Sequence, residues 1–229
     1  MNDRKTFIIT GTSRGLGKDL AKHYLANSIN IIGISRSAST IDHQNYVHFS
    51  TDIGDEIKVK KLFRYVRKNY SNIHCLINNA AISYSNNILL TSTDEINKIM
   101  KTNFLGTFIM SKEAIKIMKN NSFGRIISIS SILSKKNLPG TSIYSISKIA
   151  IEKFQNLLRV EINNSNISFD IVRLSAIENI GMSNKISDEA KKTILNNSVS
   201  KKTVTLKKII DEFDLLIFSK NKNLDLNIE

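Results

Sequence analysis

The chain has 229 residues, 41% hydrophobic and 23% charged, a composition typical of one globular domain. Its formal charge is +13, but the lysines are scattered and their densest cluster, at 201–208, lacks interleaved aromatic residues, so we expect no nucleic-acid partner. No apolar stretch reaches the length of a membrane span, no signal peptide is recognisable and a single cysteine excludes an internal disulfide, so we expect no membrane contact and a cytoplasmic location.

Short apolar, β-branched runs alternate with helical patterns along the chain, without a linker or an internal repeat. This alternation predicts one α/β domain over 1–229, with a parallel sheet covered by helices on both faces. The predicted strands are Thr6–Thr10, Ile29–Ile34, Tyr46–Phe49, His74–Ile77, Arg125–Ile129 and Phe169–Leu174. The predicted helices are Gly15–Asn27, Glu56–Tyr70, Thr93–Asn120 and Ser142–Asn163. We expect Cys75 to be buried and inert, and the polar tail Asn221–Glu229 to fray.

A glycine-rich turn follows the first predicted strand, in the sequence Thr10-Gly11-Thr12-Ser13-Arg14-Gly15-Leu16-Gly17. Glycines at such a turn let the backbone approach a pyrophosphate, while the helix N-terminus offers free N–H groups and the positive end of its dipole. The spacing is GxxxGxG and differs from the GxGxxG of the general dinucleotide fingerprint. The turn alone indicates nucleotide binding only weakly, because any tight βα turn can use glycine.

A tyrosine and a lysine lie four residues apart in Tyr144-Ser145-Ile146-Ser147-Lys148, on one face of the predicted helix. An ammonium beside a phenol favours the phenolate, so we expect Lys148 to lower the pKa of Tyr144 from about 10. Tyr144 would then donate and accept protons near neutrality. Taken alone, the pair is more easily explained as an exposed pair on a helix surface.

Further residues accompany these two motifs in a fixed order: Asn78-Asn79-Ala80 after a strand, Asn103 in a helix and Ser131 after a strand. The set resembles the short-chain dehydrogenase/reductase family in its single-domain form, from about Lys5 to Met182. The resemblance implies a Rossmann-like, doubly wound sheet whose last strand is short or missing here, with Leu224-Asp225-Leu226 as its stub. It also implies an oxidoreductase that interconverts a carbonyl and a secondary alcohol by hydride transfer, as a homodimer or homotetramer.

The roles of the family's residues carry over to matching positions. The resemblance implies that Tyr144 is the acid/base and that Lys148 lowers its pKa and holds the nicotinamide ribose. Ser131, thirteen residues before Tyr144, would hydrogen-bond the substrate carbonyl, with Ser130 as the less favoured alternative. Asn103 would anchor a water of the proton relay, and no metal ion is implied. The implied cofactor-binding residues are Gly11, Ser13, Arg14, Gly15, Leu16, Gly17, Ser35, Arg36, Asp52, Ile53, Asn78, Ala80, Tyr144, Lys148 and Ile177.

Cofactor preference is predicted at the end of the second strand, Ile34-Ser35-Arg36. NAD-preferring relatives place an acid there to bind the ribose 2′-OH, and this chain has none. Arg36 and Arg14 can pair with a 2′-phosphate from two sides, because a guanidinium donates two parallel hydrogen bonds. The alternative is a pair of solvated arginines. We therefore expect NADP(H).

Several positions depart from the family. Ala81 stands where relatives have glycine, which tightens the space beside the cofactor, and Asn179 stands where they have threonine. Leu174-Ser175 replaces Pro-Gly and alters one wall of the nicotinamide pocket. The substrate segment, about Gly181–Ser200, leaves a 3-oxoacyl-carrier-protein, a small ketone, a sugar and a nucleotide-sugar open. Ser122 and Ser165 replace two arginines of the oxoacyl reductases, which disfavours the first. A nucleotide-binding scaffold or sensor with little turnover is the alternative to an enzyme.

Overall fold

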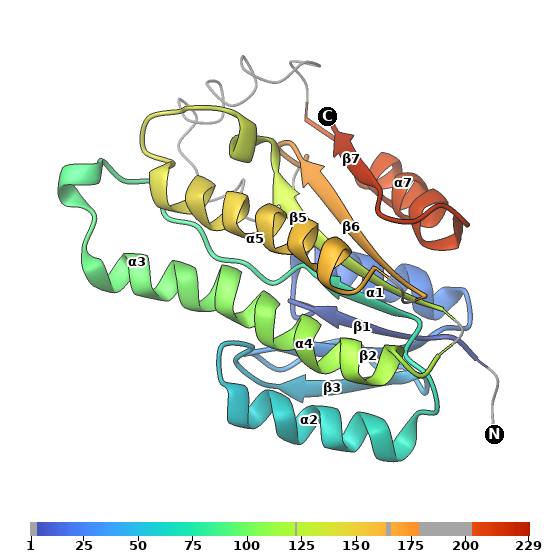
Figure 1. Cartoon of the computed structure of the whole chain (residues 1–229). Coiled ribbons are helices and arrows are strands. Elements are labelled where there is room, and N and C mark those ends of the chain that lie inside the picture. Colours follow the sequence, from blue (N-terminus) through green and yellow to red (C-terminus); the bar gives the residue numbers. More distant parts are fainter. Residues whose placement is uncertain (1–3, 122, 164–165, 179–202) are drawn as a thin grey trace.

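Seven parallel strands form one sheet in the order β3-β2-β1-β4-β5-β6-β7 (Figure 1). This computed structural model describes residues 4–121, 123–163, 166–178 and 203–229. The central strands are β-branched and buried on both faces, as expected of a parallel sheet between helices. The strands are β1 Thr6–Thr10, β2 Asn30–Ser35, β3 Tyr46–Ser50, β4 Cys75–Asn78, β5 Gly124–Ser131, β6 Ile167–Leu174 and β7 Asp225–Ile228.

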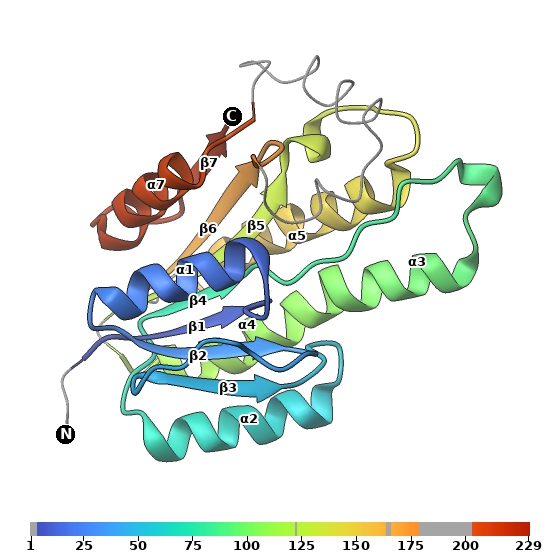
Figure 2. The ribbon, with the colours of Figure 1, turned by 180° about the vertical axis from the view of Figure 1, so that it is seen from behind.

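Helices cover both faces of the sheet, and Figure 2 shows this arrangement from behind. One hydrophobic cluster joins the sheet to α1 (Gly15–Ala26) and α7 (Leu206–Phe218). A second cluster lies under α2 (Glu56–Asn69), α4 (Gly106–Met118) and α5 (Ser142–Glu161). The remaining helical elements are η1 Ile88–Leu90, α3 Thr93–Met100, the π-helical turn η2 Lys101–Leu105 and η3 Ile132–Lys135. Within the described chain, no helix combines the length and apolar character that a membrane crossing requires.

The predicted strands and helices are confirmed within two residues at their ends, apart from one helix. The predicted helix 93–120 is α3, η2 and α4 in direct succession, so a π-helical turn lies in its middle. The fold class is confirmed, and the last strand is short, with four residues. Cys75 is buried as predicted, and this burial raises the pKa of its thiol.

Two expectations for the C-terminal region are wrong or incomplete. The tail does not fray, because β7 pairs with β6 in parallel and Ile228 is buried. The backbone N–H of Ser175 extends this pairing to Ile228 O at 3.1 Å. Helix α7 was not predicted, although Ile209, Phe213 and Leu216 recur at helical spacing and are buried. The predicted substrate segment at 181–200 and residues Asn179, Ser122 and Ser165 lie outside the described residues.

The chain order brings the candidate residues to one edge of the sheet. The chain runs outward from β1 to β2 and β3, then returns to β4 on the other side of β1. Ligands of open α/β sheets bind in the crevice at such a reversal, outside the carboxyl ends of the strands. Thr10, Ser35, Asn78 and Ser131 end β1, β2, β4 and β5 at this edge.

Candidate active site

The glycine turn between β1 and α1 is locked against the end of β4. Gly11 and Gly15 have φ angles of 79° and 59°, which favour glycine. A Cβ on Gly17 would lie 2.4 Å from both Gly11 O and Asn79 Nδ2. Thr10 Oγ1 accepts hydrogen bonds from the backbone N–H groups of Asn79 and Ala80, both at 2.9 Å. The turn therefore has one fixed shape, set by close backbone contact.

The N-terminus of α1 lacks an acidic partner in the described chain. Its N-cap residue, Arg14, makes no side-chain cap hydrogen bond, and the first turn contains no Asp or Glu. The first N–H groups of the helix and the positive end of its dipole are thus available to an anion. Arg14 and Arg36 are both exposed, and neither forms an ion pair with any described residue. This donor set fits the phosphates of a dinucleotide.

Other predicted cofactor residues lie along the same edge. Ser35 Oγ donates to Ser37 O at 2.7 Å, and Asp52 accepts from the backbone N–H of Gly54 at 2.9 Å. Ile53 is buried, and a Cβ on Gly106 would meet its side chain at 2.5 Å, so Ile53 is fixed against α4. These contacts shape the loops after β2 and β3.

Two buried oxygens at this edge lack hydrogen-bond partners among the described residues: Asn78 Oδ1 and Ser175 Oγ. They follow β4 and β6, on the two sides of β5. Ile177, beyond β6, forms a parallel bridge with Val204. Unsatisfied buried polar atoms are rare in proteins and mark sites where a ligand can complete the bonding. They agree with a polar ligand along the strand ends.

The predicted catalytic residues come together from β5 and α5. Ser131 ends β5, and its hydroxyl lies close enough to Tyr144, in the first turn of α5, to lower the pKa of the phenol. Ser131 Oγ also accepts from the backbone N–H of Leu133 at 3.2 Å. Lys148 Nζ lies 5.6 Å from the Tyr144 ring centroid and donates to Ile129 O at 2.8 Å. The structure thus joins Ser131, Tyr144 and Lys148 in one group, in which Ser131 and Lys148 are buried and Tyr144 is half-buried.

The pKa values in this group depart from the expectation. Burial raises the pKa of Tyr144 to about 12, and the hydrogen bond with Ser131 opposes this only in part. The predicted lowering by Lys148 is absent here, because the ammonium is directed to Ile129 O and desolvation of the phenolate is the larger effect. Burial lowers the pKa of Lys148 itself to about 8, while the nearby Glu152 carboxylate opposes the change.

Asn103 lies in the π-helical turn η2 and is fully buried. Its Oδ1 accepts from Ile82 N, and its Nδ2 donates to Ile82 O, both at 2.9 Å. Nδ2 also donates to Ser147 Oγ at 3.0 Å, and Ser147 immediately precedes Lys148. A single amide therefore connects the segment after β4 and the turn η2 to the Tyr144–Lys148 stretch of α5. π-Helical turns are frequent at functional sites.

The sequence reasoning missed two residues beside this group, Glu152 and Arg173. Glu152 is buried on α5, one turn beyond Lys148, and pairs with Arg173 of β6. The signal was present, since Tyr144, Lys148 and Glu152 follow one another at i, i+4 and i+8. An arginine inside an apolar strand also requires a buried partner.

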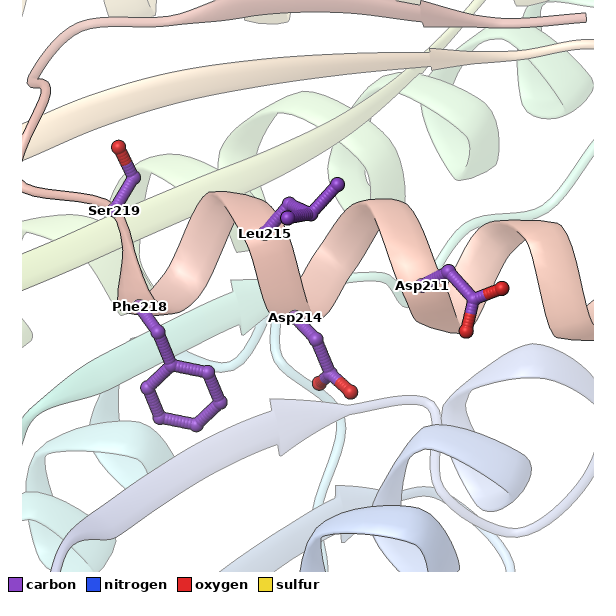
Figure 3. Close-up of a pocket in the computed structure, with 5 residues that line it drawn as sticks. All are labelled: Asp211, Asp214, Leu215, Phe218 and Ser219. Atoms are coloured by element: carbon purple, nitrogen blue, oxygen red, sulfur yellow. The ribbon is translucent and has the colours of Figure 1, made fainter.

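A separate surface hollow lies on α7, away from these residues. It is lined by Asp211, Asp214, Leu215, Phe218 and Ser219, as Figure 3 shows. Its volume is about 710 Å³, and Asp214 pairs there with His23 of α1 at 2.9 Å. None of the predicted catalytic or cofactor-binding residues lines it. It belongs to the helical layer on the other face of the sheet from α5.

The strand order and the locked glycine turn at the reversal define a Rossmann-like dinucleotide-binding fold. A profile of the family described as short chain dehydrogenase matches residues 5–191, and the chain belongs to this family of oxidoreductases, which act on CH–OH and C=O groups.

Known proteins agree with this membership. The chain is 29% identical over 227 residues to the 3-oxoacyl-[acyl-carrier-protein] reductase FabG of Buchnera aphidicola subsp. Baizongia pistaciae, covering 96% of this chain and 92% of the relative. It is 31% identical over 173 residues to carbonyl reductase family member 4 of Xenopus laevis, covering 73% of each. The solved structure of ElxO with NADP bound is 26% identical, with a TM-score of 0.86 over 98% of this chain and 97% of that one. A 4-hydroxyisoleucine dehydrogenase complexed with NADH, 20% identical, shares the fold with a TM-score of 0.90 over 99% and 97%.

Proposed function

We propose that the protein is an NADP(H)-dependent oxidoreductase that interconverts a carbonyl group and a secondary alcohol, with Tyr144 as the general acid/base. The observation that carries the proposal is the convergence of Ser131, Tyr144 and Lys148 at the carboxyl ends of the strands. The uncapped α1 N-terminus lies at the same edge of the sheet. A scaffold or sensor would have no need of this buried group, since burial disfavours the charged form of Lys148.

The chain's own residues divide the work of carbonyl reduction. A bound nicotinamide supplies the hydride for the carbonyl carbon. Ser131 Oγ donates to the substrate oxygen and stabilises its developing negative charge. Tyr144 transfers its proton to the same oxygen, and its raised pKa keeps this proton in place near neutrality. The Lys148 ammonium, charged below about pH 8, then passes a replacement proton from water to the phenolate that remains, together with Asn103.

The preference for NADP(H) rests on charge at the glycine turn and after β2. Arg14 and Arg36 are exposed arginines without ion-pair partners in the described chain, and Ser35 stands where an acid would favour NAD. Two guanidinium groups suit a 2′-phosphate, which carries up to two negative charges and binds bidentate donors. The similarity to ElxO, solved with NADP bound, supports the same choice.

For the substrate we propose a small carbonyl compound or alcohol, and a 3-oxoacyl thioester is the first class to test because FabG proteins are among the relatives. The other substrates to test in the same panel are a small ketone, a sugar and a nucleotide-sugar. We further propose a cytoplasmic homodimer or homotetramer that needs no nucleic acid or membrane. Exposed apolar side chains on η2, α4 and α5 support self-association, namely Leu105, Phe108, Ile146, Ile149 and Leu157.

The test is NADPH oxidation over this carbonyl panel by the wild type, Tyr144→Phe and the control Tyr65→Phe on α2. Loss of general acid catalysis lowers kcat by a factor of about 10²–10⁴. We expect that loss in Tyr144→Phe with near-normal NADPH affinity, and wild-type activity in the control. Tyr144→Phe with most of its activity retained would refute the mechanism. NADPH binding without turnover of any substrate would favour the scaffold or sensor.

A further inference from the structure

The carboxylate of Glu152 is the centre of a buried polar cluster next to the catalytic group. Glu152 is only 6% exposed. It accepts hydrogen bonds from Ser130 Oγ at 2.6 Å and from Ser134 Oγ. Arg173 donates to it twice, from Nε at 2.9 Å and from Nη2 at 2.7 Å. One carboxylate thus links α5 to the end of β5, to η3 and to β6.

These hydrogen bonds enclose Ser131 from both sides. Ser130 precedes it, and Ser134 Oγ, whose single proton is shared between the Glu152 carboxylate and Ser131 O, lies 2.8 Å from Ser131 O. Lys148 Nζ, one turn before Glu152 on the same face of α5, holds Ile129 O. Two consecutive turns of α5 therefore hold Ile129 and Ser130 directly and Ser131 through Ser134, which fixes the position of Ser131 relative to Tyr144.

The opposite side of the cluster reaches the last strand. Arg173 Nη2 donates to Asp225 Oδ2 of β7 at 3.2 Å, and Asp225 Oδ1 accepts from Arg159 at 2.6 Å. Two carboxylates and two guanidinium groups alternate along this chain of contacts, so their charges balance. The short β7 is thereby connected to the active site through side chains.

We propose that Glu152 is a positioning residue of the active site, which fixes the Ser131 turn and places a negative charge one helix turn from the Lys148 ammonium, with Arg173 and Asp225 holding that carboxylate in place. The inference rests on the proposed function, because it assigns Glu152 a part in that chemistry. It gives the buried pair a role beyond stability.

The charges around Lys148 determine the pH at which this side chain loses its proton. On α5 it faces Tyr144 and Glu152, Arg173 lies behind Glu152 on β6, and Lys135 Nζ of η3 is 3.7 Å from Glu152 Oε2. Burial lowers the pKa of Lys148, and the Glu152 carboxylate is the group that raises it. Neutralising Glu152 leaves nearby cations without their main counter-charge, so Lys148 loses its proton at lower pH.

The decisive variant is Glu152→Gln, which keeps the side-chain shape and removes the charge. We expect the alkaline limb of the kcat–pH profile to move about one pH unit toward acid, the size expected for one nearby charge. Since the pKa of Lys148 is about 8 in the wild type, kcat should then fall about twofold at pH 7 and about fivefold at pH 8. The KM for NADPH should change little. Asp225→Asn should also move the alkaline limb of the kcat–pH profile toward acid, by a smaller amount. The control is Glu113→Gln on α4, another buried carboxylate paired with Lys116, which should leave the profile unchanged.

A second readout is independent of turnover. In ¹³C-lysine-labelled protein, the Cε resonance of Lys148, assigned by its loss in Lys148→Met, reports the protonation of that side chain directly. Its titration midpoint should fall in Glu152→Gln and stay constant in Glu113→Gln. If the wild type reduces no carbonyl, the proposed function fails while this midpoint still tests the influence of Glu152.

Thermal unfolding shows whether each variant folds. If Glu152→Gln does not, Ser130→Ala removes one donor and leaves the ion pair, and a drop in kcat with unchanged KM is then expected. If Glu152→Gln does not fold, two results together would overturn the proposal: an unshifted Lys148 titration midpoint in Asp225→Asn and a wild-type kcat in Ser130→Ala. For a folded Glu152→Gln, wild-type kcat and an unshifted midpoint would overturn it.

Discussion

Replacing Lys148 with methionine should make the protein more stable at neutral pH while abolishing its activity. Lys148 is 3% exposed, and burial lowers its pKa from 10.5 to about 8. At 1.36 kcal/mol per pH unit, this corresponds to a cost of about 3 kcal/mol for keeping the ammonium charged in the folded state. Methionine has a similar shape and no charge, but it leaves Ile129 O without its donor, which costs about 1 kcal/mol. The expected net gain in free energy of unfolding is about 2 kcal/mol at pH 7.

The sign of the pH dependence follows from the lowered pKa. Below about pH 8 both states of the wild type carry the proton, so the folded state bears the full cost. Between pH 8 and 10.5 only the unfolded state retains it, so the wild type gains stability with rising pH. The free-energy cost of the buried ammonium therefore falls to about half by pH 9.5. The difference in free energy of unfolding between Lys148→Met and the wild type shrinks by the same amount.

The assay is urea unfolding of the wild type and Lys148→Met at several values between pH 6.5 and 9.5, compared as differences so that other titrating groups cancel. The control is Lys153→Met on the same helix, an exposed lysine that should show no such trend. A variant less stable than the wild type at pH 7, or a gain that does not change with pH, would refute the reasoning.

Three further predictions concern the cofactor, the turn and the core. Arg14→Ala and Arg36→Ala should each raise the Kd for NADPH about ten- to hundredfold by removing charge-assisted hydrogen bonds, with little change for NADH in calorimetric titrations; equal losses for both cofactors would contradict the NADP(H) preference. Gly17→Ala places a Cβ 2.4 Å from Gly11 O, so unfolding should show a loss of about 1–3 kcal/mol, and NADPH binding should weaken. Arg125→Met leaves Asp170 buried without its partner and should cost about 3–5 kcal/mol in urea unfolding, while kcat of the folded protein is retained, since this fully buried pair lies away from the Ser131 end of β5.

Local patterns were enough to predict most of the fold, because a parallel sheet between two helical layers requires buried β-branched strands and amphipathic helices in alternation. The strand from Thr6 to Thr10 was predicted with both ends correct. The π-helical turn at Lys101–Leu105 was not, because its periodicity hardly differs from that of the surrounding helix. The short strand β7 was expected from the family resemblance as a stub at Leu224-Asp225-Leu226, but the polar composition of the tail wrongly indicated fraying, since its order depends on pairing with β6.

The catalytic candidates came from the family resemblance together with the Tyr144–Lys148 spacing, and neither predicted their electrostatics. The four-residue spacing of Tyr144 and Lys148 predicted a shared face and, wrongly for this structure, a lowered pKa of Tyr144. Spacing gives proximity, whereas a pKa depends on solvent exclusion and on the direction of each donor. The Lys148 ammonium points to Ile129 O and is buried, and the half-buried Tyr144 is largely desolvated.

The sequence by itself determined the class of fold, the glycine turn and the identity of the residues at the strand ends, because these depend on local conformation and on residue type. Tertiary structure alone decided which distant residues meet. Glu152, Arg173 and Asp225 are separated by 21 and 52 positions along the chain, and no local pattern links them. They meet because β5, β6 and β7 pair side by side beneath α5, and burial there requires every charge to have a partner.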